Sequence, residues 1–160
     1  MPYIKNRTPC TNEEITELQH YLKGTPVFNL TNYFEKNHTL VYKGVIESNI
    51  DLGKTKTIWS NLGGVLSKSE YSSDKFLVKQ VCSTLKNPNC KDKGTLVKIK
   101  EYTQLLVNKK LEMKVTLLET NNQLIICDGN KRAVAWFEYF LKCKSTNIRL
   151  PVFIISTFET

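Results

Sequence analysis

One short run of the sequence combines several residue types that bind anions. Asp128-Gly129-Asn130-Lys131-Arg132 comes directly before an apolar stretch with helical spacing. A glycine lets backbone N–H groups approach a ligand, and a helix N-terminus offers unpaired N–H groups and the positive end of its dipole. That dipole disfavours cations, yet Lys131 and Arg132 fall in the first turn. A bound anion would explain their position, so we predict a phosphate-binding site formed by Gly129, Asn130, Lys131 and Arg132.

Two side chains of this run could also take part in a reaction. Arg132 can hold a phosphate through two parallel hydrogen bonds, whereas Lys131 supplies a point charge. Asp128 is a carboxylate beside a predicted anion site, where it could orient Arg132, bind Mg²⁺ or act as a base. We therefore take Asp128 and Arg132 as candidate catalytic residues, and Asp128 as a candidate Mg²⁺ ligand. In the alternative interpretation, Asp128 only caps the helix and the two cations are solvated.

The run 128–132 follows a predicted β-hairpin. Apolar and polar residues alternate over residues 113–117, which is typical of a strand. Residues 120–122 are typical of a hairpin turn, and the apolar segment 123–127 predicts a second, buried strand.

A helix and a final strand are predicted after the run. Apolar residues with helical spacing define one wide face, made of Ala133, Val134, Phe137, Phe140 and Leu141. Residues 150–155 are typical of a buried strand. The resulting order of strand, hairpin turn, strand, DGNKR, helix and strand predicts a mixed α/β fold, with the run at a strand-to-helix junction.

The N-terminal half predicts further helices and short strands. Thr11 and Glu14 form a capping-box pattern, which begins a helix that Gly24 ends. Short β-like segments follow at residues 25–28, 40–46 and 57–59. A second helix is capped by Ser72-Ser73-Asp74 and ends before Pro88, and a third covers residues 96–111, although its start could instead be a strand.

The chain has the size and composition of one domain. It contains 160 residues, of which 41% are hydrophobic and 24% charged, enough to bury a core. Residues 86–94 are its most loop-like segment and the best candidate for an internal boundary. We therefore expect an N-terminal extension, residues 1–90, packed on a core of residues 91–160 to give a single compact domain.

Three features predict a cytoplasmic protein. The sequence has no stretch of the roughly 18 apolar residues that a membrane span needs, and its start has no apolar segment typical of a secretory signal. Five cysteines at long, irregular spacings favour reduced thiols over a disulfide framework or a zinc site. We expect no membrane partner.

The charge predicts a polyanionic partner. Lys and Arg number 23 against 15 Asp and Glu, which gives a net charge of +8. Such a surplus attracts the phosphates of nucleotides or nucleic acids. The lysines are scattered along the chain and form no block of like charge, so a flexible arm that wraps nucleic acid is not indicated.

The C-terminal part resembles the ParB/sulfiredoxin-like superfamily. There, a hairpin strand runs into a DGxxR-type loop, a helix follows, and a strand of the form PVxVI ends the unit. Residues 124–132 match the strand and loop, residues 150–155 the last strand, and residues 114–117 the preceding strand, so that the resemblance covers about residues 95–157. It implies a small mixed sheet with packed helices, to which this chain adds an N-terminal helical and β extension.

The resemblance also implies a function. In that superfamily the loop binds phosphates of a nucleotide or of a phosphorylated intermediate. It therefore implies a nucleotide (ATP or CTP) and Mg²⁺ as cofactors, and a nucleotide-dependent phosphotransferase, ATPase or nuclease-like activity. A kinase would need a carboxylate base from the N-terminal half, for which Glu47, Asp51 and Glu70 are equal candidates.

Two departures from the superfamily narrow this function. Sulfiredoxins carry Cys, and partition proteins a metal-binding Glu, at the position of Asn130. Cys127 lies at the end of the strand instead, which makes sulfinic-acid reduction a poor candidate.

Two alternatives stay open. The first is a non-catalytic, basic module that binds nucleic acid or has a regulatory role. The second is a degenerate Fic-like protein, because DGNKR also occurs in the Fic motif HPFxDGNKR. The catalytic histidine of that motif would fall on Leu124, and its Pro and Phe on Ile125 and Ile126. The Fic loop joins two helices, whereas a hairpin is predicted here.

Overall fold

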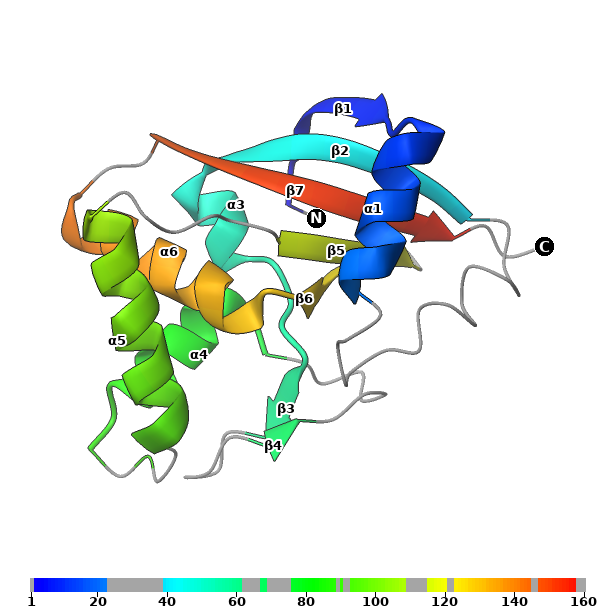
Figure 1. Cartoon of the computed structure of the whole chain (residues 1–160). Coiled ribbons are helices and arrows are strands. Elements are labelled where there is room, and N and C mark those ends of the chain that lie inside the picture. Colours follow the sequence, from blue (N-terminus) through cyan, green and yellow to red (C-terminus); the bar gives the residue numbers. More distant parts are fainter. Residues whose placement is uncertain are drawn as a thin grey trace.

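A five-stranded mixed sheet is the centre of the fold (Figure 1). The structure is a computed structural model that describes residues 2–22, 39–61, 67–68, 76–88, 90, 93–108, 115–120, 123–144 and 147–157. The strand order is β1 (Lys5–Pro9), β2 (Thr39–Ser48), β7 (Asn147–Thr157), β5 (Val115–Thr120) and β6 (Gln123–Asp128). The helices are α1 (Asn12–Leu22), α3 (Asn49–Gly53), α4 (Val78–Leu85), α5 (Lys93–Val107) and α6 (Asn130–Lys142), and a second small sheet pairs β3 (Trp59–Asn61) with β4 (Ser67–Lys68). The predicted mixed α/β class is confirmed.

The C-terminal part has the element order that we predicted. β5 and β6 pair antiparallel, β6 leads into α6, and β7 returns parallel to β5 with Val152 opposite Val115. A parallel return needs a crossover connection, and α6 is part of that connection. The run 128–132 therefore lies where β6 ends and α6 begins, between a strand and a helix rather than between two helices as in the Fic motif. Of the predicted turn, residues 121–122 lie outside the described residues.

Both halves of the chain contribute strands to this sheet. β2 pairs antiparallel with β7 along most of its length, and β1 pairs antiparallel with β2. The strand predicted over residues 40–46 is confirmed and extends further at both ends. The strand predicted over residues 25–28 lies outside the described residues.

Helices cover both faces of the sheet. Neighbouring residues of a strand point to opposite faces, so Leu117 on β5 joins the large core with α6, whereas Leu118 joins a smaller cluster with Leu18 and Leu22 of α1. α4 and α5 pack against α6, and α1 lies across the sheet from them (Figure 1). None of the described helices is long and apolar enough to cross a membrane.

The capping box of α1 is confirmed. The N–H of Glu14 donates to Thr11 Oγ1 at 3.2 Å, and the N–H of Thr11 donates to a carboxylate oxygen of Glu14 at 3.1 Å. These reciprocal bonds satisfy two donors that a helix start leaves without partners. Gly24, where we expected the helix to end, lies outside the described residues.

The helix predicted after residues 72–74 begins later than expected. α4 starts at Val78, and the N–H of Leu77 donates to the side chain of Gln80 at 2.8 Å. This bond satisfies one N–H at the helix start without a Ser or Asp at the cap position. Residues 72–74 lie outside the described residues.

The next helix, α5, begins and ends earlier than predicted. It spans Lys93–Val107, whereas we expected residues 96–111. Its start is helical, so the alternative of a strand there is wrong. Lys93 and Gly94 belong to the helix, which shortens the loop expected over residues 86–94.

The predicted apolar face of α6 is partly correct. Ala133, Val134 and Phe137 are buried as expected, but Leu141 is 50% exposed and the unpredicted Ala135 is fully buried. The reason is that α3, α4 and α5 all pack against α6. Near the start of α6, the buried residues therefore cover more of the helix circumference than the single apolar face that we predicted. Leu141 lies in the last turn, beside a pocket described below.

Candidate functional site

The loop between β6 and α6 has the geometry of an uncapped helix start. Gly129 has φ 89° and ψ 24°, a left-handed conformation that glycine adopts without strain. It is the N-cap residue of α6, and no side chain of the described residues accepts a hydrogen bond from the first turn. The interpretation of Asp128 as a helix cap is therefore wrong. The first-turn N–H groups have no acceptor within the helix, so they are available to an anion.

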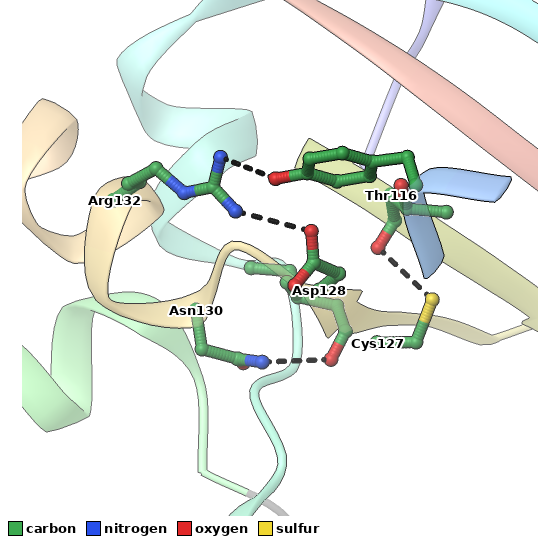
Figure 2. Close-up of polar contacts among 7 residues, drawn as sticks. Thr116, Cys127, Asp128, Asn130 and Arg132 are labelled. Atoms are coloured by element: carbon green, nitrogen blue, oxygen red, sulfur yellow. Dashed lines mark hydrogen bonds and ion pairs between the residues drawn. The ribbon is translucent and has the colours of Figure 1, made fainter. Parts of the chain in front are cut away.

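Asp128 is paired with Arg132 instead. Arg132 Nη2 donates to Asp128 Oδ2 at 3.0 Å, and the two side chains are only 15% and 16% exposed (Figure 2). Of the roles considered for Asp128, this contact corresponds to orienting Arg132. Because this ion pair is mostly buried, it fixes the guanidinium: breaking it would leave a charge without a partner.

Arg132 also contacts a residue that the sequence did not indicate. Its Nη1 donates to the hydroxyl of Tyr21 at 3.1 Å, so α1 reaches across the sheet edge to the loop. Tyr21 is separated from Arg132 by 111 positions and carries no local motif. Only the packing of α1 on the sheet could have identified it.

The side chain of Asn130 is used inside the protein. It is 7% exposed, and its Nδ2 donates to the carbonyl of Ile126 at 3.1 Å (Figure 2). Its Oδ1 accepts from the N–H of Ile58 at 3.1 Å. Asn130 therefore ties the start of α6 to β6 and to the segment before β3. The strand predicted over residues 57–59 begins only at Trp59, and the N–H of Ile58 is bound by Asn130. A phosphate contact from Asn130 would have to come from its main-chain N–H.

Lys131 is the cation of the loop that stays available. Its side chain is partly buried, and it forms no ion pair with any described residue. Among the described residues, no ion pair of its ammonium therefore offsets the unfavourable dipole in the first turn of α6. Gly129, Lys131 and Arg132 are thus together at the helix start, as the sequence predicted.

Cys127 precedes the loop and is chemically protected. It is buried, and its S–H donates to the carbonyl of Thr116 at 3.3 Å (Figure 2). Burial, with the nearby charge of Asp128, raises the pKa of the Cys127 thiol to about 12. The thiolate is the reactive form of cysteine, so Cys127 is no nucleophile near neutral pH. All five cysteines are free.

The carboxylates considered as a general base do not contact the loop in the described part of the chain. Glu47 of β2 pairs with Lys5 of β1 at 3.1 Å, and these two strands lie at the opposite edge of the sheet from β6. Asp51 lies in the first turn of α3. Glu70 lies outside the described residues. Asp128 is thus the carboxylate that the structure places at the loop.

The donor set at the loop limits the metals it would suit. Asp128 is one carboxylate, and the described residues contain no group of three or more His, Cys, Asp or Glu side chains that could hold a metal. Mg²⁺ is commonly bound by one or two carboxylates together with phosphate oxygens of a substrate. A single Asp fits that mode if a phosphate is bound at the same place.

Comparison of this chain with protein-family models, with curated proteins and with solved structures gives no match. The chemistry that the loop can perform is therefore inferred from its geometry. An uncapped helix start, one unpaired lysine and one fixed guanidinium all favour a bound anion.

Proposed function

We propose that this protein binds the phosphate of a nucleotide or a nucleic acid at residues 128–132. The observation that carries the proposal is that α6 begins without a side-chain cap while its first turn contains Lys131 and Arg132. Both features are unfavourable for an isolated helix, and one bound phosphate would compensate both. The net charge of +8 favours the same kind of ligand.

Each residue has a distinct part in this proposal. Gly129 lets the main chain turn so that the N–H groups of the first turn face a phosphate oxygen. Lys131 contributes a point charge. Arg132, fixed by Asp128 and Tyr21, keeps further N–H donors in a defined plane, since a guanidinium has five and these contacts use two. A Mg²⁺ ion, when bound, would neutralise phosphate charge beside Asp128.

We further propose that the chain is a ParB/sulfiredoxin-like protein. The strand, loop, helix and parallel strand formed by β6, residues 128–132, α6 and β7 are compatible with that resemblance. Within this proposal, a nucleotide-dependent phosphotransferase, a nucleotide hydrolase and a nuclease-like enzyme stay candidates.

A non-catalytic binding module is the second candidate. Asp128 is already engaged by Arg132, and neither Glu47 nor Asp51 forms a hydrogen bond or ion pair with the loop among the described residues. A base that must take a proton from a substrate would have to leave its present partner. This observation favours binding over turnover.

A thermal-shift panel tests the binding proposal. ATP, CTP, GTP, AMP, pyrophosphate and a short single-stranded oligonucleotide are each added with and without Mg²⁺. A ligand at about a hundred times its Kd should stabilise the protein by about 2.7 kcal/mol. Lys131→Ala should weaken binding about tenfold, which corresponds to about 1.4 kcal/mol. Lys100→Ala, at an exposed position of α5, is the matched control and should bind like the wild type.

The outcomes separate the candidates. A nucleotide-specific shift that Lys131→Ala reduces supports a nucleotide site, and release of phosphate from that nucleotide then supports an enzyme. Binding of only the oligonucleotide, with an affinity that falls steeply with salt, supports the non-catalytic module. If no phosphate compound shifts the melting temperature, or if Lys131→Ala and Lys100→Ala behave alike, the loop is not a phosphate site.

A further inference from the structure

A pocket lies at the other end of α6 from the loop 128–132. It has a volume of about 410 Å³ and lies between α3 and the C-terminal half of α6, with Lys79 of α4 at its side. Phe140 is eight residues beyond Arg132, a distance of about 12 Å along a helix. The pocket is therefore separate from the loop 128–132, and its ligand is independent of the function proposed above.

The walls of this pocket are apolar and include exposed side chains. Phe137 and Phe140 form part of the lining, and Ile50 and Leu141 are 59% and 50% exposed. Single exposed apolar residues are common on protein surfaces, but these two lie around the same hollow. Exposed apolar side chains around one hollow are typical of a ligand-binding site.

The close fit of α3 on α6 forms the pocket. A Cβ on Gly53 would come within 2.8 Å of the Phe137 ring, so the absence of a side chain lets α3 lie directly on that ring. Asn49 Nδ2 also donates to the carbonyl of Phe137 at 3.3 Å. Both contacts fix the two helices relative to each other, so the pocket is present before any ligand binds.

Three lysines surround these apolar walls. Lys54, Lys79 and Lys144 line the pocket, no carboxylate is among its described lining residues, and none of the three forms an ion pair in the described part of the chain. Two nearby lysines differ: Lys86, which follows α4, and Lys142 of α6 both approach Glu138, at 3.9 and 3.2 Å. The positive charge at the pocket is therefore not neutralised within the described structure.

The lining also includes a buried polar group. Asn49 is 6% exposed, and its Oδ1 accepts no hydrogen bond in the described part of the chain. A buried acceptor without a donor is unfavourable.

We propose that this pocket binds a small amphipathic anion. The apolar, aryl or alkyl part would lie against Ile50, Phe140 and Leu141, and a carboxylate, sulfonate or phosphate group would lie among the lysines. The volume is within the range of about 300–1,000 Å³ that small-molecule sites occupy, and such sites combine apolar walls with a few polar groups.

The proposal is tested with two fluorescent probes that share one apolar body. 8-Anilinonaphthalene-1-sulfonate carries an anionic group, whereas N-phenyl-1-naphthylamine has the same rings without it. Both are titrated into the folded protein. We expect the sulfonate to bind in one equivalent and at least tenfold more tightly, about 1.4 kcal/mol of added affinity.

Variants then place the probe in the pocket. Lys79→Gln/Lys144→Gln should weaken the sulfonate about tenfold and leave the neutral probe within about twofold, since only the charge is changed. Lys98→Gln/Lys100→Gln, which removes two exposed lysines of α5, is the matched control and should change neither. Leu141→Asn should weaken both probes, because it removes an apolar wall. All replaced residues are exposed, so melting temperatures should stay close to that of the wild type.

Three results would overturn the proposal. They are the absence of sulfonate binding, equal affinity for the two probes, and a sulfonate affinity that does not respond to Lys79→Gln/Lys144→Gln. Lys131→Ala should leave the sulfonate affinity unchanged, which distinguishes this pocket from the loop 128–132.

Discussion

Replacing Arg132 by Met should destabilise the protein more than replacing Arg132 and Asp128 together. The two side chains are 15% and 16% exposed and joined at 3.0 Å, so removal of the guanidinium leaves a mostly buried carboxylate without its cation. Breaking a buried pair costs about 3–5 kcal/mol, and the remaining exposure lowers our expectation to about 2–4 kcal/mol. Met keeps most of the apolar stem of Arg, so the loss reports on the charge.

The double variant Asp128→Asn/Arg132→Met should lose less than the sum of its two single variants. With both charges removed, no desolvated ion is left without a partner, so the penalty of the single variants is absent. Tyr21→Phe measures separately the hydrogen bond between Arg132 and α1, which we expect to contribute about 1 kcal/mol. The assay is urea unfolding of the wild type, the two single variants, the double variant and Tyr21→Phe, with free energies of unfolding extrapolated to water.

One result of this double-mutant cycle would contradict the proposed interaction between Asp128 and Arg132. If the two single changes add to the double change within about 0.5 kcal/mol, Asp128 and Arg132 do not interact energetically, and Asp128 does not orient Arg132. Phosphate binding by the same proteins adds a second comparison. Asp128→Asn keeps the guanidinium, so a loss of binding in that variant would support the orienting role.

Three further predictions concern other parts of the fold. Arg7 donates to the Glu119 carboxylate at 2.7 and 2.6 Å, which lowers the Glu119 pKa. The stabilisation that this ion pair gives is fully present above the ordinary glutamate pKa of about 4.3 and is lost as the pH falls through the lowered pKa of Glu119. Below that range, the wild type should therefore lose about 0.5–1 kcal/mol more of its free energy of unfolding than Glu119→Gln, as measured by urea unfolding. Thr11→Ala should lower the free energy of unfolding by about 1 kcal/mol, because it removes one half of the capping box of α1. Iodoacetamide should alkylate the exposed Cys143 in the native protein but Cys127 only after unfolding, as read by mass spectrometry; native labelling of Cys127 would contradict its burial and its pKa of about 12.

The sequence alone determined the features that depend on neighbours along the chain. Helix capping and hydrophobic periodicity act over a few residues, which is why the capping box at Thr11, the hairpin strands and the position of DGNKR between β6 and α6 were predictable. The contact between Asp128 and Arg132 was also among the roles considered for Asp128 from the sequence, because the two residues are only four positions apart in the chain. Helix ends were less predictable, as the late start of α4 shows, since a Gln side chain satisfied the N–H that a Ser or Asp was expected to satisfy.

Only the tertiary structure decided what surrounds these elements. Tyr21 reaches Arg132 because α1 packs on the sheet through Leu18 and Leu22, and no local pattern relates positions so far apart. The same holds for Asn130, whose side chain the sequence assigned to a ligand and the fold directs to the N–H of Ile58. The pocket between α3 and α6 likewise depends on the contact of Gly53 with the Phe137 ring. These contacts are set by the packing of segments that are distant in sequence, and packing depends on the shape and volume of the whole core rather than on the spacing of residues along the chain.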